Sequence, residues 1–328
     1  MRLESATIVG AGAWGTALAQ AAALAGLKVT LISRNRDLVE EIRQHRTNTK
    51  YLPNIRLEAG IAAEPLFVPG DIVIMAVPAQ ETRGALQAIE PEFLARRPVV
   101  LTAKGLEAGT LARQSEILLD MALDAVPYVL SGPSFAADVA MGRPTAVTLA
   151  GDGASDTSAL AAALAGPSLR PYASDDRIGV EVAGALKNVY ALACGAVEGA
   201  GLGFSARSAL LARGYAEMAR IVAAMGGSAS TLTGLAGLGD LTLSCTTAQS
   251  RNYQFGLALG RGESVETIMA GGAKLAEGVA TAPVAALLAA RHEVDAPLVA
   301  AVNQLLARRA GITDIVAGLM SRPLKREG

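Results

Sequence analysis

Residues 6–24 read ATIVGAGAWGTALAQAAAL, and this stretch decides the fold of the first half of the chain. Its apolar run from Ala6 to Gly10 predicts a buried parallel strand. The Ala- and Leu-rich part from Thr16 to Leu24 predicts a helix that ends before Gly26. The sequence therefore predicts a strand, a glycine-rich turn and a helix in direct succession.

The turn contains Gly10, Gly12 and Gly15 in the pattern GxGxxG. The first glycine permits a tight turn, the second lets a pyrophosphate approach the backbone, and the third lets the helix pack closely on the strand. The phosphates would then face the free N–H groups of the helix N-terminus. Three glycines can also form an ordinary turn. A second strand, predicted at residues 28–33, favours the dinucleotide site.

Strands and helices alternate through the first half, and strands stop near Ser174. Further strands are predicted at residues 71–77, 98–103, 127–130 and 145–150, and later helices at 177–197, 206–225, 252–259, 281–291 and 297–309. Alternation indicates βαβ units and a parallel sheet. We therefore predict an α/β protein. A Rossmann-type, doubly wound, mostly parallel sheet forms a dinucleotide-binding domain over residues 1–174. An all-α, substrate-binding domain follows over residues 175–328.

Composition narrows the class of protein. The chain has 328 residues, of which 51% are hydrophobic and 18% charged, as expected for an ordered globular protein. Its 29 basic and 30 acidic residues give a net charge of −1, without the basic excess that is typical of nucleic-acid-binding proteins. Cys194 and Cys245, with only two histidines, predict neither a metal site nor a disulfide framework. We expect a soluble, cytoplasmic protein, because no signal peptide is evident and charges interrupt every apolar stretch before it could span a membrane.

The end of the second predicted strand bears on the choice of dinucleotide. An NAD site usually carries Asp or Glu there, whereas this chain reads Ser33-Arg34-Asn35-Arg36. A guanidinium suits a 2′-phosphate, so the sequence predicts that NADP(H) is preferred and that NAD(H) is also used. The alternative is two solvated arginines in a surface loop.

Lys187 is the most informative single residue. It is the only charged residue between Val182 and Val197, in a stretch that reads VAGALKNVYALACGAV. A helix that is apolar on every side is normally buried, and a buried ammonium needs partners or a site. The adjacent Asn188 is polar, and Gly184 leaves room for a close approach. The alternative is a lysine whose ammonium reaches the surface.

Two other segments carry candidate polar groups. Lys104 follows a predicted strand at its carboxyl end, where doubly wound sheets bind ligands, although a structural loop lysine fits this feature equally well. Asp240 is the only acid in residues 234–252 and should pair with a cation. Ser250 is expected to cap a helix that starts at Arg251. With Asn252, these groups would form an anion cradle, unless the helix is an ordinary capped surface helix.

A set of longer motifs runs in order through nearly the whole chain. They are GAGAWGTALA at 10–19, YLPN at 51–54, AVP at 76–78, AKGLE at 103–107, LSGPSFAADVAMGRPTAV at 130–147, GVEVAGALKNVYALACG at 179–195, ARGYAEM at 212–218, GLAGLGDLTLSCT at 234–246, SRN at 250–252 and AEGVATA at 276–282. Together they resemble the bacterial-type NAD(P)-dependent glycerol-3-phosphate dehydrogenases. SGPSFA, GALKN and GLGDL are far more specific than the glycine fingerprint.

This resemblance assigns roles to particular residues. Lys187 matches the proton-transferring lysine, and Lys104 matches a lysine that touches both cofactor and substrate. Lys187 and Lys104 would contact substrate together with Gly132, Ser134, Asp240, Ser250, Arg251 and Asn252. Cofactor contacts would come from Gly10, Gly12, Ala13, Trp14, Gly15, Arg34, Lys104, Ala136, Arg251, Leu275 and Glu277.

The chain departs from the family pattern at three positions. Ser205 stands where the family often has Asn, Tyr253 replaces a usual Arg after SRN, and Thr247 stands for a frequent Ser. None of these positions is assigned to the chemistry.

The resemblance implies a reversible hydride transfer between NAD(P)H and carbon 2 of dihydroxyacetone phosphate. The product, sn-glycerol 3-phosphate, would supply glycerophospholipid synthesis. The expected partner is a small phosphorylated substrate. We expect no nucleic-acid partner and no membrane span, and a homodimer is a possible assembly. One alternative is a regulatory module that binds NADP(H) without turnover, which a buried Lys187 beside an anion cradle disfavours. Another is a β-hydroxyacid dehydrogenase, against which SGPSFA and SRN favour a phosphorylated substrate.

Overall fold

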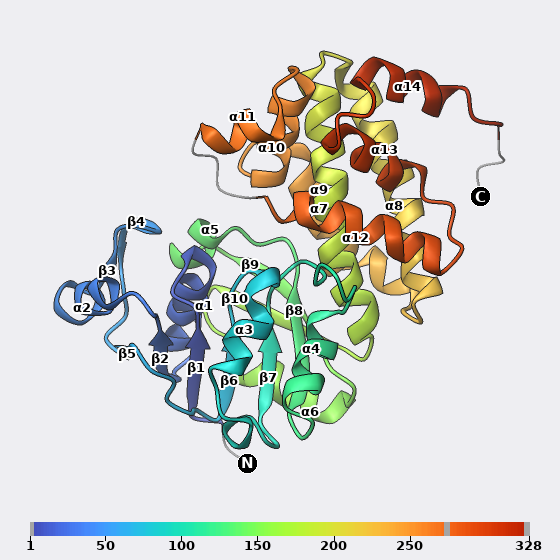
Figure 1. Ribbon diagram of the computed structural model, residues 1–328. Coiled ribbons are helices and arrows are strands. Elements are labelled where there is room, and N and C mark those ends of the chain that lie inside the picture. Colours follow the sequence, from blue (N-terminus) through green and yellow to red (C-terminus); the bar gives the residue numbers. More distant parts are fainter. Residues whose placement is uncertain (1–2, 272–275, 325–328) are drawn as a thin grey trace. The chain divides into compact units, whose positions relative to one another are not determined.

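The computed structural model describes residues 3–271 and 276–324 (Figure 1). The strands are β1 Ser5–Val9, β2 Lys28–Ile32, β3 Thr47–Asn48, β4 Leu52–Arg56, β5 Ile61–Glu64, β6 Ile72–Met75, β7 Pro98–Leu101, β8 Val126–Ser131, β9 Thr145–Ala150 and β10 Leu169–Ser174. The helices are α1 Ala13–Leu24, α2 Arg36–His45, α3 Thr82–Gln87, α4 Gln114–Met121, α5 Ala136–Ala140, α6 Ala154–Leu164, α7 Arg177–Gly199, α8 Gly203–Ala224, α9 Asp240–Thr246, α10 Arg251–Gly260, α11 Val265–Ala270, α12 Glu277–Arg291, α13 Pro297–Leu306 and α14 Ile312–Met320. Short 3₁₀ and π turns connect some of them, including η1 Ala79–Glu81 and the π turn η4 Leu235–Gly239.

The predicted fold class is confirmed. The strands form an eight-stranded sheet in the order β10-β9-β8-β7-β6-β1-β2-β5, with a separate β3–β4 hairpin. All neighbours in the large sheet are parallel except β8 and β9. After β10, the described residues contain helices and turns but no further strand.

Different helices cover the two faces of the sheet (Figure 1). On one face, Ile8 and Ile74 belong to a buried cluster that also contains side chains of α1, α2, α5 and α6. On the other face, Val73 and Met75 belong to a second cluster with side chains of α3 and α4. Successive residues of a strand point to opposite faces, so strands covered on both sides are continuously apolar, as the sequence shows.

The carboxyl ends of the parallel strands place several loops at one edge of the sheet. Strands β1, β6, β7 and β8 are mutually parallel, so the loops after them leave the same edge. The chain order reverses beside β1, which has β2 on one side and β6 on the other. Ligands of open α/β sheets bind at such a switch point.

Some elements differ from the sequence prediction. The edge strands β5 and β10 were not predicted, because β5 is only four residues long and β10 alternates buried and exposed residues around Pro171. The helices α3, α4, α5, α6, α9, α11 and α14 are short or weakly patterned and were also missed. These helices have only five to eleven residues, and helices this short are held by their neighbours rather than by intrinsic propensity.

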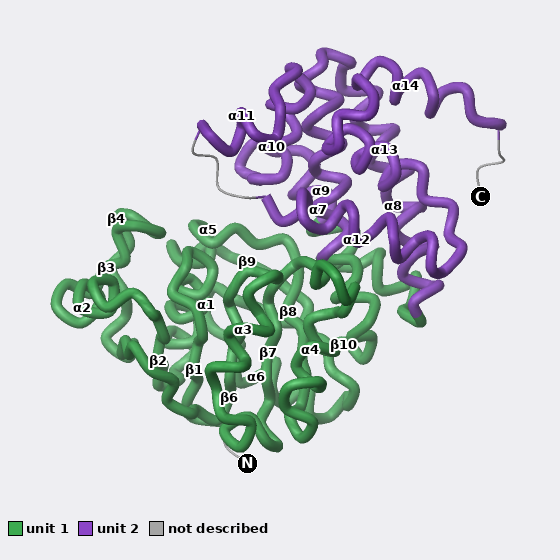
Figure 2. The backbone as a smooth tube through the Cα atoms, viewed as in Figure 1, with its two compact units in different colours: residues 1–184, 226–240 green, residues 185–225, 241–328 purple. Residues whose placement is uncertain are grey.

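The chain forms two compact units (Figure 2). The first contains residues 1–184 and 226–240, and the second contains residues 185–225 and 241–328. The unit boundary lies inside α7, and a later segment returns to the first unit. The division into domains 1–174 and 175–328 remains a prediction, since these compact units are cut at other residues.

The first turns of α7 are anchored within the first unit. The Glu181 carboxylate accepts hydrogen bonds from the Ser115 backbone N–H, at 2.8 Å, and from the Ser115 hydroxyl, at 2.7 Å. Burial raises the pKa of the Glu181 carboxyl, while the nearby Arg113 and the two Ser115 hydrogen bonds act in the opposite direction. Glu181 thereby ties α7 to the start of α4.

Within the second unit, α7 and α10 pack with their backbones in contact. A Cβ atom on Gly195 of α7 would lie 2.1 Å from the carbonyl oxygen of Tyr253, and one on Gly256 of α10 would lie 2.1 Å from that of Leu192. Gly199 and Gly260 repeat this relation one turn later. Glycines on both helices allow a separation that no other residue permits.

Helix α7 is long and apolar enough to cross a membrane, and no other described helix is. However, 94% of its most apolar window is buried inside the protein. Burial of this kind is typical of the central helix of a folded core.

Candidate active site

The glycine-rich turn after β1 has the geometry that a dinucleotide requires. Gly10 has φ +108°, and a Cβ atom there would lie 2.7 Å from the Ala76 carbonyl oxygen. A Cβ atom on Gly15 would lie 1.9 Å from the Gly10 carbonyl oxygen, so this glycine allows α1 to pack on the turn. Gly12 instead faces open space. It is the N-cap of α1 and no side chain caps that end, which suits a phosphate ligand.

The neighbouring residues also fit a bound dinucleotide. Ala13 and Trp14 are the first residues of α1, and both are half-buried. The Trp14 Nε1 atom is buried and has no hydrogen-bond partner among the described residues. A buried donor of this kind is free to donate a hydrogen bond to water or to a ligand at the turn. The half-buried Ala136 begins α5, which packs against α1.

Arg34 lies just beyond the end of β2 and is exposed. The adjacent Asn35 caps α2, since its side chain accepts a hydrogen bond of 3.2 Å from the Leu38 backbone N–H. Asn35 therefore has a structural task, whereas the Arg34 guanidinium remains accessible to a ligand beside the edge of the sheet.

Lys104 and Asp240 form a charged pair in the first unit. Lys104 Nζ lies 2.7 Å from Asp240 Oδ2, and the Asp240 side chain is only 1% exposed. The sequence required a cationic partner for Asp240, and the structure supplies Lys104. Asp240 begins α9 directly after the π turn η4, a rare element that often marks functional sites.

The same lysine contacts the loop that follows β8. Lys104 Nζ donates to the Gly132 carbonyl oxygen at 3.0 Å, and the Ser134 hydroxyl donates to that oxygen at the same distance. Gly132 has φ +148°, which favours glycine, and a Cβ atom there would lie 2.9 Å from Val147 Cα. Four predicted substrate residues, Lys104, Gly132, Ser134 and Asp240, thus lie together.

The side chains of Ser131 and Lys104 lie beside Gly184. A Cβ atom on Gly184 would lie 2.8 Å from Ser131 Oγ and 3.7 Å from Lys104 Cγ. Gly184 therefore lets the end of β8 and the Lys104 side chain pack against α7. Sequence reasoning recognised that Gly184 leaves room but could not identify Ser131 as the neighbour.

Lys187 is buried in the second unit. The residue is 7% exposed, and its Nζ donates a hydrogen bond of 2.8 Å to the hydroxyl of Ser244, which is 3% exposed. The prediction of a buried lysine with a polar partner is confirmed. Sequence reasoning missed Ser244. Its position four residues after Asp240, in the hydroxyl-rich segment of α9, is the signal that could have indicated it.

The start of α10 brings together the other polar candidates. Ser250 is the N-cap, as predicted, and its hydroxyl accepts from the Tyr253 backbone N–H at 3.3 Å. Arg251 is exposed in the first turn. Asn252 is buried, donates to Asn188 Oδ1 at 2.8 Å and accepts from the Gly278 backbone N–H at 2.9 Å. It therefore fixes the start of α10 against α7 and α12.

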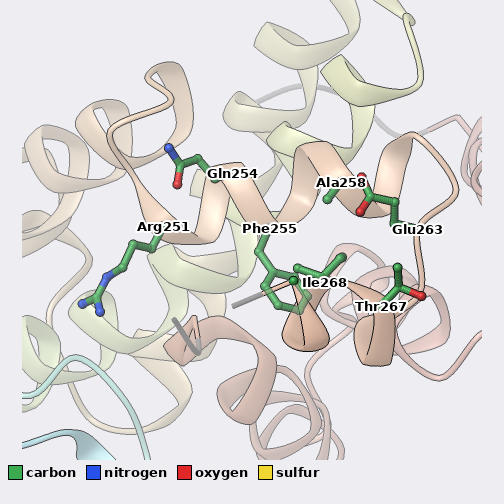
Figure 3. Close-up of a pocket in the computed structure, with 8 residues that line it drawn as sticks. Arg251, Gln254, Phe255, Ala258, Glu263, Thr267 and Ile268 are labelled. Carbon is green, nitrogen blue, oxygen red and sulfur yellow. The ribbon is translucent and has the colours of Figure 1, made fainter. Parts of the chain in front are cut away.

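A hollow of about 390 Å³ lies between α10 and α11. Figure 3 shows Phe255 and Ile268 packed together, with Arg251 toward one end and Glu263 toward the other. The Arg251 side chain thus stands beside a partly apolar recess at the helix N-terminus.

The remaining cofactor candidates lie near the start of α12. Glu277 is its first residue and is half-buried. Leu275 lies outside the described residues.

The departure at Tyr253 has a local explanation. The side chain is 1% exposed, and its hydroxyl bonds to Glu198 and accepts from Arg207 at 2.9 Å. Burial, followed by the contact with Glu198, raises the pKa of Tyr253 to about 12. The tyrosine thus joins α7, α8 and α10 at the first turn of α10.

Comparison with known families decides the relationship. The family model for the N-terminus of NAD-dependent glycerol-3-phosphate dehydrogenase matches residues 5–157 of this chain. The family model for the C-terminus matches residues 176–317. This chain belongs to the NAD-dependent glycerol-3-phosphate dehydrogenase family.

Relatives within this family cover nearly the whole chain. Glycerol-3-phosphate dehydrogenase [NAD(P)+] of Maricaulis maris is 46% identical over 99% of this chain and 98% of its own. That of Bradyrhizobium diazoefficiens is 48% identical, with coverages of 99% and 98%. The crystal structure of glycerol-3-phosphate dehydrogenase from Coxiella burnetii is 35% identical, with a TM-score of 0.88 over 98% of this chain and 99% of that one.

Proposed function

We propose that this family member catalyses the reversible NAD(P)-dependent interconversion of dihydroxyacetone phosphate and sn-glycerol 3-phosphate. The observation that carries the proposal is Lys187, a buried lysine that bonds to a serine hydroxyl and is the only charged residue between Val182 and Val197 of α7. A buried lysine needs polar partners, and a positioned lysine amine can act as a general acid or base. The family membership supports the same reaction.

In the reducing direction, Lys187 Nζ donates its proton to the oxygen on carbon 2 of dihydroxyacetone phosphate. In the oxidising direction, its neutral amine accepts that proton. Ser244 holds Nζ at 2.8 Å and so restricts the direction in which the amine presents its proton. When bound, NAD(P)H supplies the hydride for carbon 2.

Other residues bind and orient the reactants in this proposal. Arg251, Ser250 and Asn252 hold the substrate phosphate at the N-terminus of α10. Lys104, fixed by Asp240, contacts the substrate together with Gly132 and Ser134 and also touches the cofactor. The dinucleotide is bound by Gly10, Gly12, Ala13, Trp14, Gly15, Arg34, Ala136, Arg251, Leu275 and Glu277.

The test is a spectrophotometric assay of the purified protein. Addition of dihydroxyacetone phosphate should cause oxidation of NADPH, which is measured as the loss of absorbance of the reduced nicotinamide. NADH should support a slower rate. A chain that binds NADPH but turns over no phosphorylated ketone would contradict the proposed reaction and favour a regulatory module.

Cofactor preference should depend on Arg34. The Arg34→Asp variant should lower kcat/KM for NADPH far more than for NADH, because a carboxylate repels the 2′-phosphate and accepts hydrogen bonds from a free ribose. The measurement is kcat/KM for both cofactors in parallel. Arg56→Asp, which changes another exposed arginine, in β4, is the control. Equal losses with the two cofactors would show that Arg34 does not contact the 2′-phosphate.

Binding of the substrate phosphate should depend on Arg251. A charge-assisted hydrogen bond contributes about 1.5–3 kcal/mol, roughly 10- to 150-fold, so Arg251→Ala should lower kcat/KM for dihydroxyacetone phosphate by at least about tenfold. NADPH affinity is measured separately, because this residue is also proposed to touch the cofactor. The control is Arg261→Ala, at the opposite end of α10. Normal turnover by Arg251→Ala would place the phosphate elsewhere.

We further propose that the reaction takes place in the cytoplasm, that its product supplies glycerophospholipid synthesis, and that the enzyme is a homodimer. Size-exclusion chromatography with light scattering tests the assembly.

A further inference from the structure

The loop that carries Lys104 is held by side-chain amides. Residues 102–113 lie between β7 and α4 and form no helix or strand, although Gly105 and Leu106 are buried. Gln114 Nε2 donates to the Gly105 carbonyl oxygen at 2.9 Å, and Gln80 Nε2 donates to the Leu106 carbonyl oxygen at 2.8 Å. Glutamine side chains therefore satisfy two successive carbonyl groups directly after the lysine.

Gln80 makes a second contact with the same loop. Its Oε1 accepts from the Ala108 backbone N–H at 2.9 Å, so one amide group engages both Leu106 and Ala108. Gln80 belongs to η1, which follows β6, whereas Lys104 follows β7. Gln80 is exposed, yet both polar atoms of its side chain form hydrogen bonds with this loop.

These contacts hold the main chain that carries Lys104, and the ammonium group of Lys104 is held as well. The Lys104 ammonium contacts Gly132 and Asp240, at 3.0 and 2.7 Å. A lysine side chain has several rotatable bonds, so its ammonium keeps one place only when the main chain beneath it does.

We propose that Gln80 is a positioning residue for Lys104: through its two hydrogen bonds to Leu106 and Ala108, it sets the loop so that the ammonium meets the reactants. This inference rests on the proposed function, in which Lys104 contacts substrate and cofactor. In this proposal Gln80 itself contacts neither substrate nor cofactor. Misplacement of a binding group by about 1 Å can cost roughly 100-fold in rate, so the effect should be measurable.

The first experiment compares Gln80→Met with the parent enzyme. Methionine keeps the length of the side chain and removes both hydrogen bonds. We expect kcat/KM for dihydroxyacetone phosphate to fall by roughly 10- to 100-fold. The control is Gln44→Met, because Gln44 bonds to Glu40 on the surface of α2 and should leave kcat/KM unchanged. An unchanged kcat/KM in Gln80→Met would overturn the proposal.

The second experiment separates positioning from a general structural effect by a double-mutant cycle with Lys104→Met. If Gln80 acts through Lys104, Gln80→Met should cause no further loss of kcat/KM once the ammonium is absent. Equal fold-losses in both backgrounds would overturn the inference. Gln80→Asn, which keeps the amide but is too short to reach both partners, is carried through the same cycle in case Gln80→Met does not fold. If the parent enzyme lacks activity with dihydroxyacetone phosphate, the proposed function fails instead.

Discussion

Lys187→Met is expected to lower kcat by at least about 100-fold while the protein remains folded. General acid–base catalysis typically contributes about 10²–10⁴-fold, and methionine keeps the length and apolar stem of lysine while removing the proton. Removal of a buried charge should not unfold the protein, because its burial is itself unfavourable. The measurements are kcat with dihydroxyacetone phosphate, NADPH affinity by fluorescence, and the midpoint of thermal unfolding.

The control for this substitution is Lys28→Met, which changes an exposed lysine at the start of β2. It should leave kcat unchanged. NADPH affinity should change little in Lys187→Met, because the glycine-rich turn is untouched. A folded Lys187→Met enzyme that keeps more than about a tenth of its kcat would have lost less than such a group usually contributes. Lys104 would then become the candidate for proton transfer.

Gly256→Ala should strongly destabilise the second unit. The added Cβ atom would lie 2.1 Å from the Leu192 carbonyl oxygen and 3.0 Å from the Ala196 nitrogen. Both are main-chain atoms of α7, which cannot rotate away as a side chain could. We expect the free energy of unfolding to fall by about 3 kcal/mol or more, at the upper end of overpacking effects. The midpoint of thermal unfolding should drop by about 6 °C or more.

The matched control is Gly318→Ala, in α14 of the same unit. A Cβ atom there would meet nothing within 4 Å. Alanine is a better helix former than glycine, so this variant should gain about 0.5–1 kcal/mol. A gain of stability in Gly256→Ala similar to that in Gly318→Ala would show that helix propensity, rather than contact between α7 and α10, determines the outcome. Displacement of α10 should also lower kcat/KM, because Asn252 bonds to Asn188 across the same contact.

The sequence was informative where a local pattern has one physical solution. A GxGxxG turn between a strand and a helix specifies both the backbone conformation at Gly10 and the close packing at Gly15. A lysine that is the only charge in a long apolar stretch is expected to be buried with a partner, and Lys187, the only charge between Val182 and Val197, is. The cap at Ser250 follows equally from its place before a helix.

The sequence was less informative where stability comes from neighbours. The edge strand β5 has four residues and, within the described part of the chain, pairs only with β2, so its pattern is too short to recognise. The same holds for α9, which is seven residues long yet carries Asp240 and Ser244. Short elements of this kind form because the surrounding structure holds them, and local propensity gives little sign of them.

On its own, the sequence determined the dinucleotide-binding sheet, the helical second half, and the need of Asp240 and Lys187 for polar partners. Only the tertiary structure decided which partners these are: Lys104 for Asp240, and Ser244 for Lys187. It also placed Ser131 beside Gly184 and brought Gln80 to the Lys104 loop. The reason is physical. Burial of a charge dictates that a partner must exist, whereas its identity depends on which distant segments the packing of strands and helices brings within hydrogen-bond distance.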